Sequence, residues 1–243
     1  MSTPQRQHSL LYEFGPRIGG KKSDQAYEML KRAILLRRFP PETQLLEQTL
    51  AGELGCSQST VREALLNLAK DGLVERRGYG GTLVTDTSLA EAAAMVQVRL
   101  TIERDVAVSL VQRGVTTSEP DLVALLERMD EAHQHDDLYL GSELDRTFHS
   151  ELARVAGMGL VSPILQRCAL HIHRYTLSSV EVPREFFQEA GLDEEHRALL
   201  DELCCGSQAR AETAIVSHLD HVLQRWSPSL HSAVGSAAFE TQE

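Results

Sequence analysis

The 243-residue sequence has no apolar run of the roughly 20 residues that a membrane-spanning helix requires. Its first 20 residues also lack the apolar segment of a secretory signal. Only four cysteines are present, and no two of them form a CxxC pair of the redox or zinc-binding kind. We therefore expect a cytoplasmic protein with reduced thiols and no membrane partner.

Lysine is absent after residue 85, and acidic side chains dominate that part of the chain. Residues 1–85 carry 12 Lys and Arg against 9 Asp and Glu, a formal charge of +3. Residues 86–243 carry 12 Arg against 26 Asp and Glu, a formal charge of −14. Only the first part has the sign of charge that suits a polyanion. The charge therefore predicts two modules, of which the first approaches nucleic-acid phosphates.

The pattern of apolar residues predicts two domains between two tails. Residues 23–86 contain three helical segments and then two short strands around a Gly-rich turn, which is typical of a winged helix-turn-helix. Residues 88–227 show helical periodicity alone, with mostly short loops, which indicates an antiparallel all-helical bundle. Residues 1–22 and 228–243 are expected to be flexible tails. The predicted fold is mainly α, with a small β-wing in the first domain.

The third predicted helix of the first domain carries the side chains best suited to read DNA. Ser57 can cap this helix, as Ser23 can cap the first one. Gln58 and Arg62 lie one turn apart on one side, where they could read adenine and guanine in the major groove. A solvated helix face would show the same pattern, but the wing and the charge division favour DNA binding. Contacts with the sugar-phosphate backbone of DNA are expected at the start of this helix and at the wing tip, from Ser57, Ser59, Thr60, Tyr79, Gly80 and Gly81.

The segment LLEQTLAGELGCSQSTVREALLNLAKDGLVERRGYGGTLV resembles the winged-helix domain of bacterial GntR-family transcription regulators. The matching features are Leu54-Gly55, VREAL, Asp71-Gly72-Leu73 and a wing that contains glycine. Family members commonly have a basic residue where this chain has Gln48, Gln58 and Gly80. The resemblance implies DNA binding and adds Gln48 to the expected contacts. Because the reading face has fewer arginines, we expect an operator that differs from the usual one.

A set of histidines in the second domain could bind a metal ion. Asp145 and His149 are four residues apart and so face the same side of one helix, while His196 and His218 lie on later helical segments. Three imidazoles and one carboxylate suit a divalent transition metal such as zinc, nickel or manganese. By helix phase, however, His221 fits as well as His218. A lone inward histidine is also more often a hydrogen-bonded core residue than a ligand, so the spacing leaves both readings open.

The segments LDRTFHSELARVAG, DEEHRALLDEL and AIVSHLDHVL resemble the metal-binding segments of the FCD effector domain, which occurs in the FadR-type branch of the GntR family. The resemblance disfavours His221 and implies four ligands: Asp145, His149, His196 and His218. QVRLTIE resembles the first helix of that domain and implies that Arg99 points into an effector cavity. His171 and Arg174 on a neighbouring helix are further candidates for this cavity.

These features predict an effector-controlled transcription regulator, most simply a repressor, and no enzymatic activity. We expect a homodimer that binds a short palindromic operator in double-stranded DNA. The expected effector is a small organic acid held by the metal and Arg99. A regulator that senses the metal ion itself is a second hypothesis. A metallohydrolase with an appended nucleic-acid-binding module is a third, and Glu195 is its one obvious candidate base.

Overall fold

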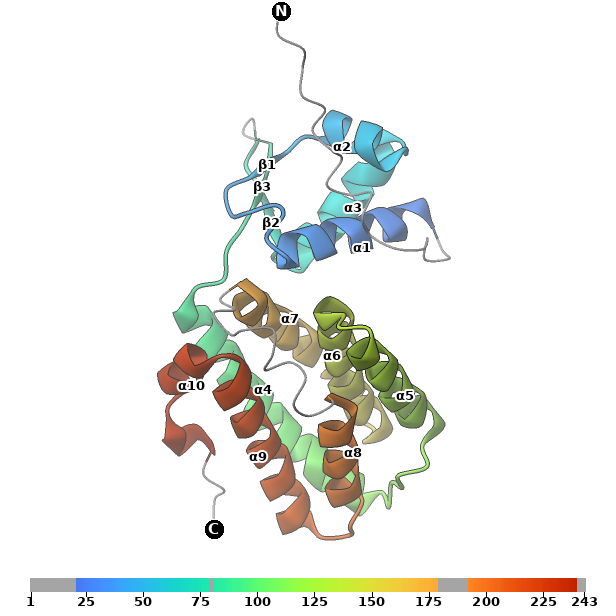
Figure 1. The fold of residues 1–243 in the computed structure, drawn as a ribbon, viewed down its shortest axis with the longest axis vertical. Helices are drawn as coiled ribbons and strands as arrows, with labels where there is room; N and C mark the ends of the chain where they lie inside the picture. The colour runs from blue at the N-terminus through green and yellow to red at the C-terminus, as the bar shows by residue number, and fades with distance from the viewer. Residues whose placement is uncertain (1–20, 79–80, 179–191, 240–243) are drawn as a thin grey trace, which may run out of the picture. The chain divides into compact units, whose positions relative to one another are not determined.

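The computed structural model describes residues 21–78, 81–178 and 192–239 (Figure 1). The chain divides into two compact units, Met1–Asp86 and Thr87–Glu243, which are taken here one at a time. None of the described helices is long and apolar enough to cross a membrane.

The first unit combines three helices with a small antiparallel sheet. Its elements are α1 (Lys22–Leu35), β1 (Gln44–Leu45), α2 (Glu47–Leu54), α3 (Gln58–Lys70), β2 (Val74–Arg76) and β3 (Thr82–Val84). The strand order is β1-β3-β2, and β2 and β3 form the wing. The sequence predicted only two strands. It missed β1 because two residues are too few to show the alternation of apolar and polar side chains that indicates a strand.

The position of α3 follows from its buried stripe and its cap. One face of α3 packs against α1. Four apolar side chains of this face are buried: Val61, Ala64, Leu65 and Leu68. Ser57 Oγ accepts a hydrogen bond from the Thr60 N–H at 3.1 Å, so the predicted cap is present. Gly55 ends α2 with a φ of 60°, a left-handed conformation that favours glycine in the turn before α3. Ser23, by contrast, does not cap α1, because the helix already begins at Lys22 and Ser23 is buried in its first turn.

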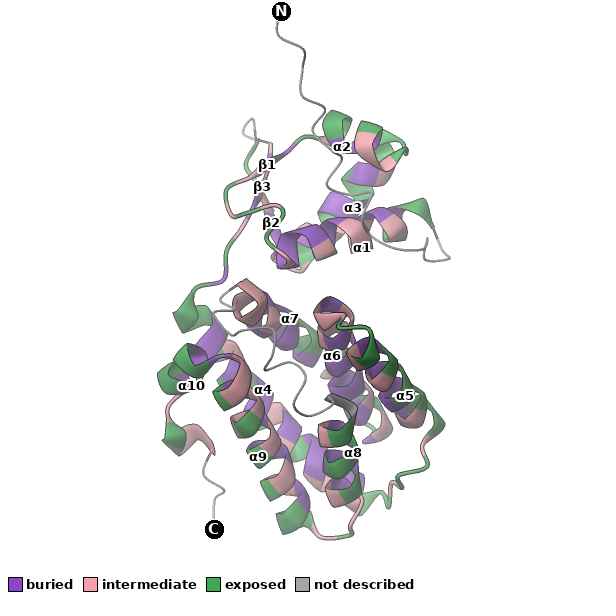
Figure 2. Ribbon diagram, in the orientation of Figure 1, coloured by how far each residue is buried: buried purple, intermediate pink, exposed green. Residues whose placement is uncertain are grey.

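The second unit consists of helices, and its described residues contain no strand. They form α4 (Leu89–Gln112), α5 (Pro120–Gln134), α6 (Leu138–Val155), α7 (Ser162–Ser178), α8 (Leu192–Leu203), α9 (Gln208–Trp226), α10 (Pro228–Val234) and a short 3-10 helix, η3 (Ser236–Phe239). The long helix α4 is continuous and contacts α6, α7, α8, α9 and α10. Figure 2 shows that the helices turn their buried residues toward one another.

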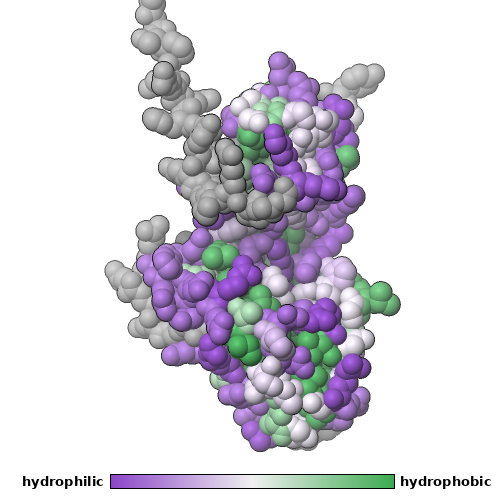
Figure 3. Space-filling model, turned by 90° about the vertical axis from the view of Figure 1, so that its right-hand side faces the viewer, coloured by the Kyte–Doolittle hydropathy of each residue, from purple (hydrophilic) through white to green (hydrophobic). Residues whose placement is uncertain are grey.

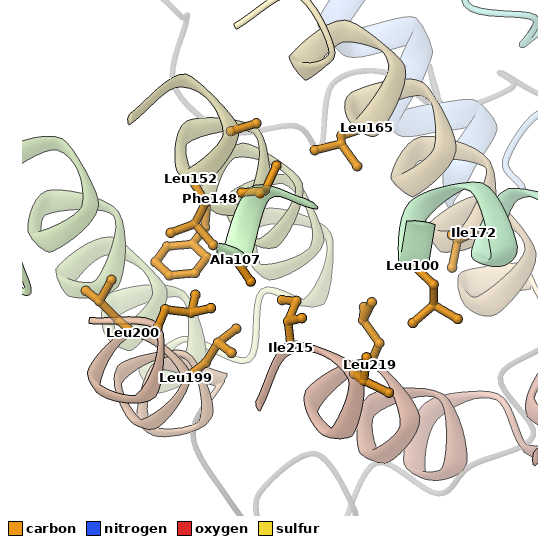
Figure 4. Close-up of a cluster of buried hydrophobic side chains, with 14 of the residues drawn as sticks. Leu100, Ala107, Phe148, Leu152, Leu165, Ile172, Leu199, Leu200, Ile215 and Leu219 are labelled. Carbon is orange, nitrogen blue, oxygen red and sulfur yellow. The ribbon is translucent and has the colours of Figure 1, made fainter. Parts of the chain in front are cut away.

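The core of this unit is one apolar cluster to which all the main helices contribute. Figure 4 shows side chains that meet there, including Leu100 from α4, Phe148 from α6, Ile172 from α7, Leu199 from α8 and Leu219 from α9. Burial of these side chains from five helices fixes how the helices pack. The helices that carry the predicted metal ligands, α6, α8 and α9, are therefore held around one interior.

The chain after Trp226 differs from the flexible tail predicted for residues 228–243. Pro228 begins α10, a position where the N–H that proline lacks would have no helical partner. Leu230 and Val234 are buried in the apolar core, and α10 packs against α4 and α9. The sequence did not reveal this helix because seven residues are too few to show helical periodicity. Residues 240–243 lie outside the described part of the chain.

Candidate functional site

The predicted DNA-reading side chains lie on the surface of the first unit. Gln48 on α2 and Gln58, Ser59 and Arg62 on α3 are exposed. Tyr79 and Gly80 of the wing tip are outside the described residues. Gly81 adopts a φ of 77°, which a residue with a side chain rarely adopts, so the wing needs glycine at this position.

Arg62 is held by a carboxylate that the sequence reading overlooked. Its Nε lies 3.0 Å from both Glu47 carboxylate oxygens, and its Nη2 lies 2.6 Å from Oε2. The hydrogen bonds from Arg62 lower the pKa of Glu47. The two residues are fifteen positions apart on different helices, so no helical spacing could have revealed the pair. Because Nε and Nη2 are engaged, paired hydrogen bonds from this edge of the guanidinium to guanine would require the ion pair to open.

The second unit brings the four predicted metal ligands together in its interior. They are Asp145 and His149 from α6, His196 from α8 and His218 from α9, and one potential ligand atom of each lies within 4.8 Å of the others. His196 Nε2 is 3.1 Å from Asp145 Oδ1, and His149 Nε2 is 3.6 Å from the same oxygen. His221 lies apart, with 65% of its side chain exposed and its Nε2 3.8 Å from Glu195. The geometry therefore separates His218 from His221, which helix phase did not.

The donor set fits a divalent transition metal. His149 Nε2 and His218 Nε2 are buried and have no hydrogen-bond partner among the described residues, which is costly for a buried polar atom. Burial and the nearby His196 and His149 rings hold the pKa of His218 well below its usual value. Burial also lowers the pKa of His149. Both rings are therefore neutral near pH 7, the form in which an imidazole nitrogen binds a metal.

Asp145 supplies the one carboxylate of the cluster. Burial would raise its pKa, but the neighbouring Arg99 and His149, with hydrogen bonds from His173 and His196, hold the pKa well below the usual value. The group is therefore an anion. A carboxylate with three imidazoles is a donor set that zinc, nickel and manganese can all accept.

Glu103 is a second residue that the sequence reading missed. It lies one turn after Arg99 on α4 and is buried, and its Oε2 is 2.6 Å from His149 Nδ1. A proton on Nδ1 donated to Glu103 leaves Nε2 with its lone pair toward the cluster, as in many metal sites. Its Oε1 accepts a hydrogen bond from Arg99 Nε at 2.5 Å. Burial would raise the pKa of Glu103, but Arg99 and His149 lower it below the usual value. In the sequence, Glu103 lies four residues after Arg99, and this helical spacing was the signal that could have indicated the pair.

A cavity of about 130 Å³ lies next to the cluster, and Arg99 and Asp145 line it. Arg99 Nη2 is 3.7 Å from Asp145 Oδ2 and has no hydrogen-bond partner among the described residues. His173 also lines the cavity, and its Nε2 is 3.1 Å from Asp145 Oδ2.

The structure corrects the prediction that His171 and Arg174 line the effector cavity. Both side chains are buried elsewhere on α7, and His171 Nδ1 is 3.0 Å from Thr87 Oγ1. Residues two apart on a helix point about 200° apart, so His171 and His173 cannot both face the cavity. The sequence indicated that only one could do so, and the choice fell on the wrong one.

Comparison with known proteins matches both units to families. Residues 22–84 match the bacterial regulatory proteins of the gntR family, and residues 94–221 match the FCD domain. The chain is 25% identical over 198 residues to the probable D-xylose utilization operon transcriptional repressor of Paenarthrobacter nicotinovorans, covering 81% of this chain and 85% of that protein. It is 27% identical over 162 residues to the HTH-type transcriptional repressor RspR of Escherichia coli strain K12, covering 65% and 70%.

Solved structures show the same fold. The chain is similar to E. coli McbR/YncC, with a TM-score of 0.64 at 19% identity over 84% of this chain and 96% of that one. It is also similar to a GntR regulator from Rhodococcus sp. RHA1, with a TM-score of 0.62 at 20% identity over 86% and 98%. The winged helix-turn-helix and the all-helical second domain predicted from the sequence are thereby confirmed. The chain belongs to the GntR family of bacterial transcription regulators, in the branch whose second domain is an FCD domain.

Proposed function

We propose that the protein is a repressor whose affinity for its operator is controlled by a small organic acid bound beside a divalent transition metal. Family membership supports a DNA-binding regulator with a small-molecule effector, since the first domain of the chain implies DNA binding and its FCD domain implies the effector. Two relatives are named as repressors. The observation that supports a metal and an organic acid is the buried cluster of three imidazoles and one carboxylate, which lies beside a cavity that Arg99 lines.

The metal would be zinc, nickel or manganese. Asp145, His149, His196 and His218 would hold it, and Glu103 would fix the orientation of the His149 ring. Four protein ligands leave coordination positions open on a six-coordinate ion. When bound, the metal would supply a Lewis acid for an anionic oxygen of the effector.

Arg99 would bind the effector carboxylate. Arg99 lines the cavity. Its Nη2 is buried and lacks a hydrogen-bond partner among the described residues, while its Nε donates to Glu103. A guanidinium in this setting offers short, charge-assisted hydrogen bonds to a carboxylate. Metal and arginine together would therefore select an acid over a neutral molecule.

The operator would be a short palindrome bound by a homodimer. Each chain presents one reading helix, and its few side chains can specify only a few base pairs, so two half-sites are needed. The proposed contacts are Gln48, Ser57, Gln58, Ser59, Thr60, Arg62, Tyr79, Gly80 and Gly81. Large apolar side chains exposed on the second unit, among them Val98 and Ile164, provide surface for dimer contacts. Figure 3 shows apolar patches on one face of this unit.

Hydrolysis is not supported, because the expected base is engaged elsewhere. The Glu195 carboxylate is 3.1 Å from Arg225 Nη1, on the side of α8 where His221 also lies. The relatives found by comparison are likewise transcription regulators.

A thermal-shift screen of the metal-loaded protein with small carboxylates tests the proposal. An acid that binds the native state raises the melting temperature, and each such acid is then tested for its effect on DNA affinity. We expect at least one acid to change both quantities. The proposal is wrong if acids stabilise the protein but none of them changes its affinity for DNA, because a controlling ligand must couple the two sites.

A further inference from the structure

The cavity extends well away from the four proposed metal ligands. Four residues of α6 line it along one face: Leu138, Gly141, Ser142 and Asp145. Asp145 belongs to the cluster, and Leu138 lies about 10 Å further along the helix axis. On α9 the lining runs in the same way from Leu219, next to the ligand His218, to Trp226. A ligand whose carboxylate reaches Arg99 must therefore place the rest of its body along these two helices.

The walls along this path are mostly apolar. They include Val96, Met129, Leu138, Ile172, Leu219 and Leu223. Ser142 and Thr176 supply the hydroxyl groups of the lining. A sugar acid carries four or five hydroxyls, and those that lie against the apolar walls would lose their hydrogen bonds to water without finding a partner, which disfavours binding. An apolar body would instead gain by leaving water.

The far end of the cavity carries negative charge. Asp136 and Asp137, at the junction of α5 and α6, line it together with His133. Asp137 accepts a hydrogen bond from the Leu140 N–H, which caps α6. Among the described residues, Arg99 is the one arginine or lysine in the lining, and it lies at the opposite end. The second carboxylate of a dicarboxylate would therefore approach two acidic side chains, and like charges repel.

The size of the cavity limits the ligand to a small body. Its volume of about 130 Å³ is close to that of an engineered protein cavity of about 150 Å³ that binds benzene. One six-membered ring or a branched alkyl chain of similar size would fit. A long acyl chain would extend beyond this volume.

We infer that the effector is a monocarboxylate with an apolar body about the size of one aromatic ring, and not a sugar acid or a dicarboxylate. This inference rests on the proposed function, since it places the carboxylate at Arg99 beside the metal. Specificity then comes from the apolar walls and from the acidic far end.

Isothermal titration of the metal-loaded, full-length protein tests the inference. The probes are phenylacetate and 4-methylpentanoate as apolar monocarboxylates, gluconate as a sugar acid, and glutarate as a dicarboxylate. We expect at least one apolar acid to bind roughly tenfold or more tightly than gluconate and glutarate. If gluconate or glutarate binds as tightly as both apolar acids, the inference is wrong while the proposed function stands. If none of the four binds, the carboxylate effector is itself overturned, and the inference with it.

Two variants test the wall and the far end separately. Val222→Thr adds a hydroxyl to the lining at constant volume and should weaken binding of the apolar acid roughly tenfold, whereas Val155→Thr, on α6 outside the lining, should leave it unchanged.

Asp136→Asn removes one far-end charge at a residue with a φ of 52°, which asparagine tolerates. It should strengthen glutarate binding several-fold, and Asp105→Asn on the exposed face of α4 should not. Unchanged affinities in both cavity variants would contradict this assignment of the specificity residues.

Discussion

The proposed DNA-reading residue Arg62 is oriented by a carboxylate on a neighbouring helix. In the DNA-free protein its guanidinium is oriented by Glu47, with two of its N–H groups engaged. Exposed ion pairs of this kind contribute little to stability, so Glu47 is better understood as a residue that orients Arg62. If Arg62 reads guanine as proposed, the ion pair must open on DNA, or Arg62 must use its remaining N–H groups.

Arg62→Ala should weaken binding to the specific operator by roughly tenfold to a hundredfold if Arg62 reads guanine, and should leave binding to random DNA nearly unchanged. Arg210→Ala is a matched control, because Arg210 forms a similar exposed pair with Glu202 in the second unit. Fluorescence anisotropy with both duplexes measures the difference. An equal loss on random DNA would mean that Arg62 contacts phosphate instead.

The four-residue cluster makes a similarly specific claim about His149. His149→Ala should lose most of the bound metal, because three ligands and an unfilled polar space remain. His221→Ala should retain it, since His221 is exposed and outside the cluster. Elemental analysis of the purified variants should find roughly one ion per chain in the wild type and in His221→Ala. Retention in His149→Ala with loss in His221→Ala would refute the ligand assignment.

At the scale of whole elements, α10 shows how a short helix completes a core. Leu230 and Val234 close the apolar cluster where α4 and α9 meet, and Asp220 Oδ1 of α9 is 2.7 Å from His231 Nε2 of α10. Such a helix would not form alone in water, because isolated helices of this length are unstable. Its structure depends on the surface that it covers.

Leu230→Ala should destabilise the second unit by about 2–5 kcal/mol, the usual cost of removing a fully buried leucine side chain. Ser232→Ala, at an exposed position of the same helix, should change stability by less than about 0.5 kcal/mol. Urea unfolding followed by circular dichroism distinguishes the two. Equal stability of both variants would show that α10 does not pack as described.

The sequence predicted those elements whose signals are local and missed those that depend on tertiary contacts. Long apolar periodicity located the helices of both units, and Ser57 was identified as a cap because capping acts within one turn. Ser23 looked equally suitable, but burial against the rest of the first unit decided its place. At the four-residue cluster, a spacing of four located Asp145 and His149, whereas Glu103 and His173 join the site through contacts between helices.

For the whole molecule, the division of charge separates two tasks. The first 85 residues carry a net +3 and the remainder −14, so bulk attraction to DNA is confined to the reading domain. An acidic effector domain does not bind DNA non-specifically, and in the proposed dimer the affinity then depends on base contacts and on the arrangement of the two reading domains.

Effector binding can act on DNA only by favouring one arrangement of the reading domains over another. The coupling between such sites is typically about 1–3 kcal/mol, or roughly 5- to 150-fold in affinity. Arg99→Ala should abolish this coupling because it weakens binding of the acid. Because Arg99 also contacts Glu103, metal content is measured in the same sample, and full metal occupancy shows that the variant has lost only the effector contact.

The most direct test of the account is the affinity of the metal-loaded protein for a duplex selected from random DNA, with and without a saturating concentration of the acid that stabilises it most. We predict a change in Kd of roughly 5- to 150-fold in the wild type and none in Arg99→Ala. An unchanged wild-type Kd at full occupancy by the acid would contradict the claim that this site controls DNA binding.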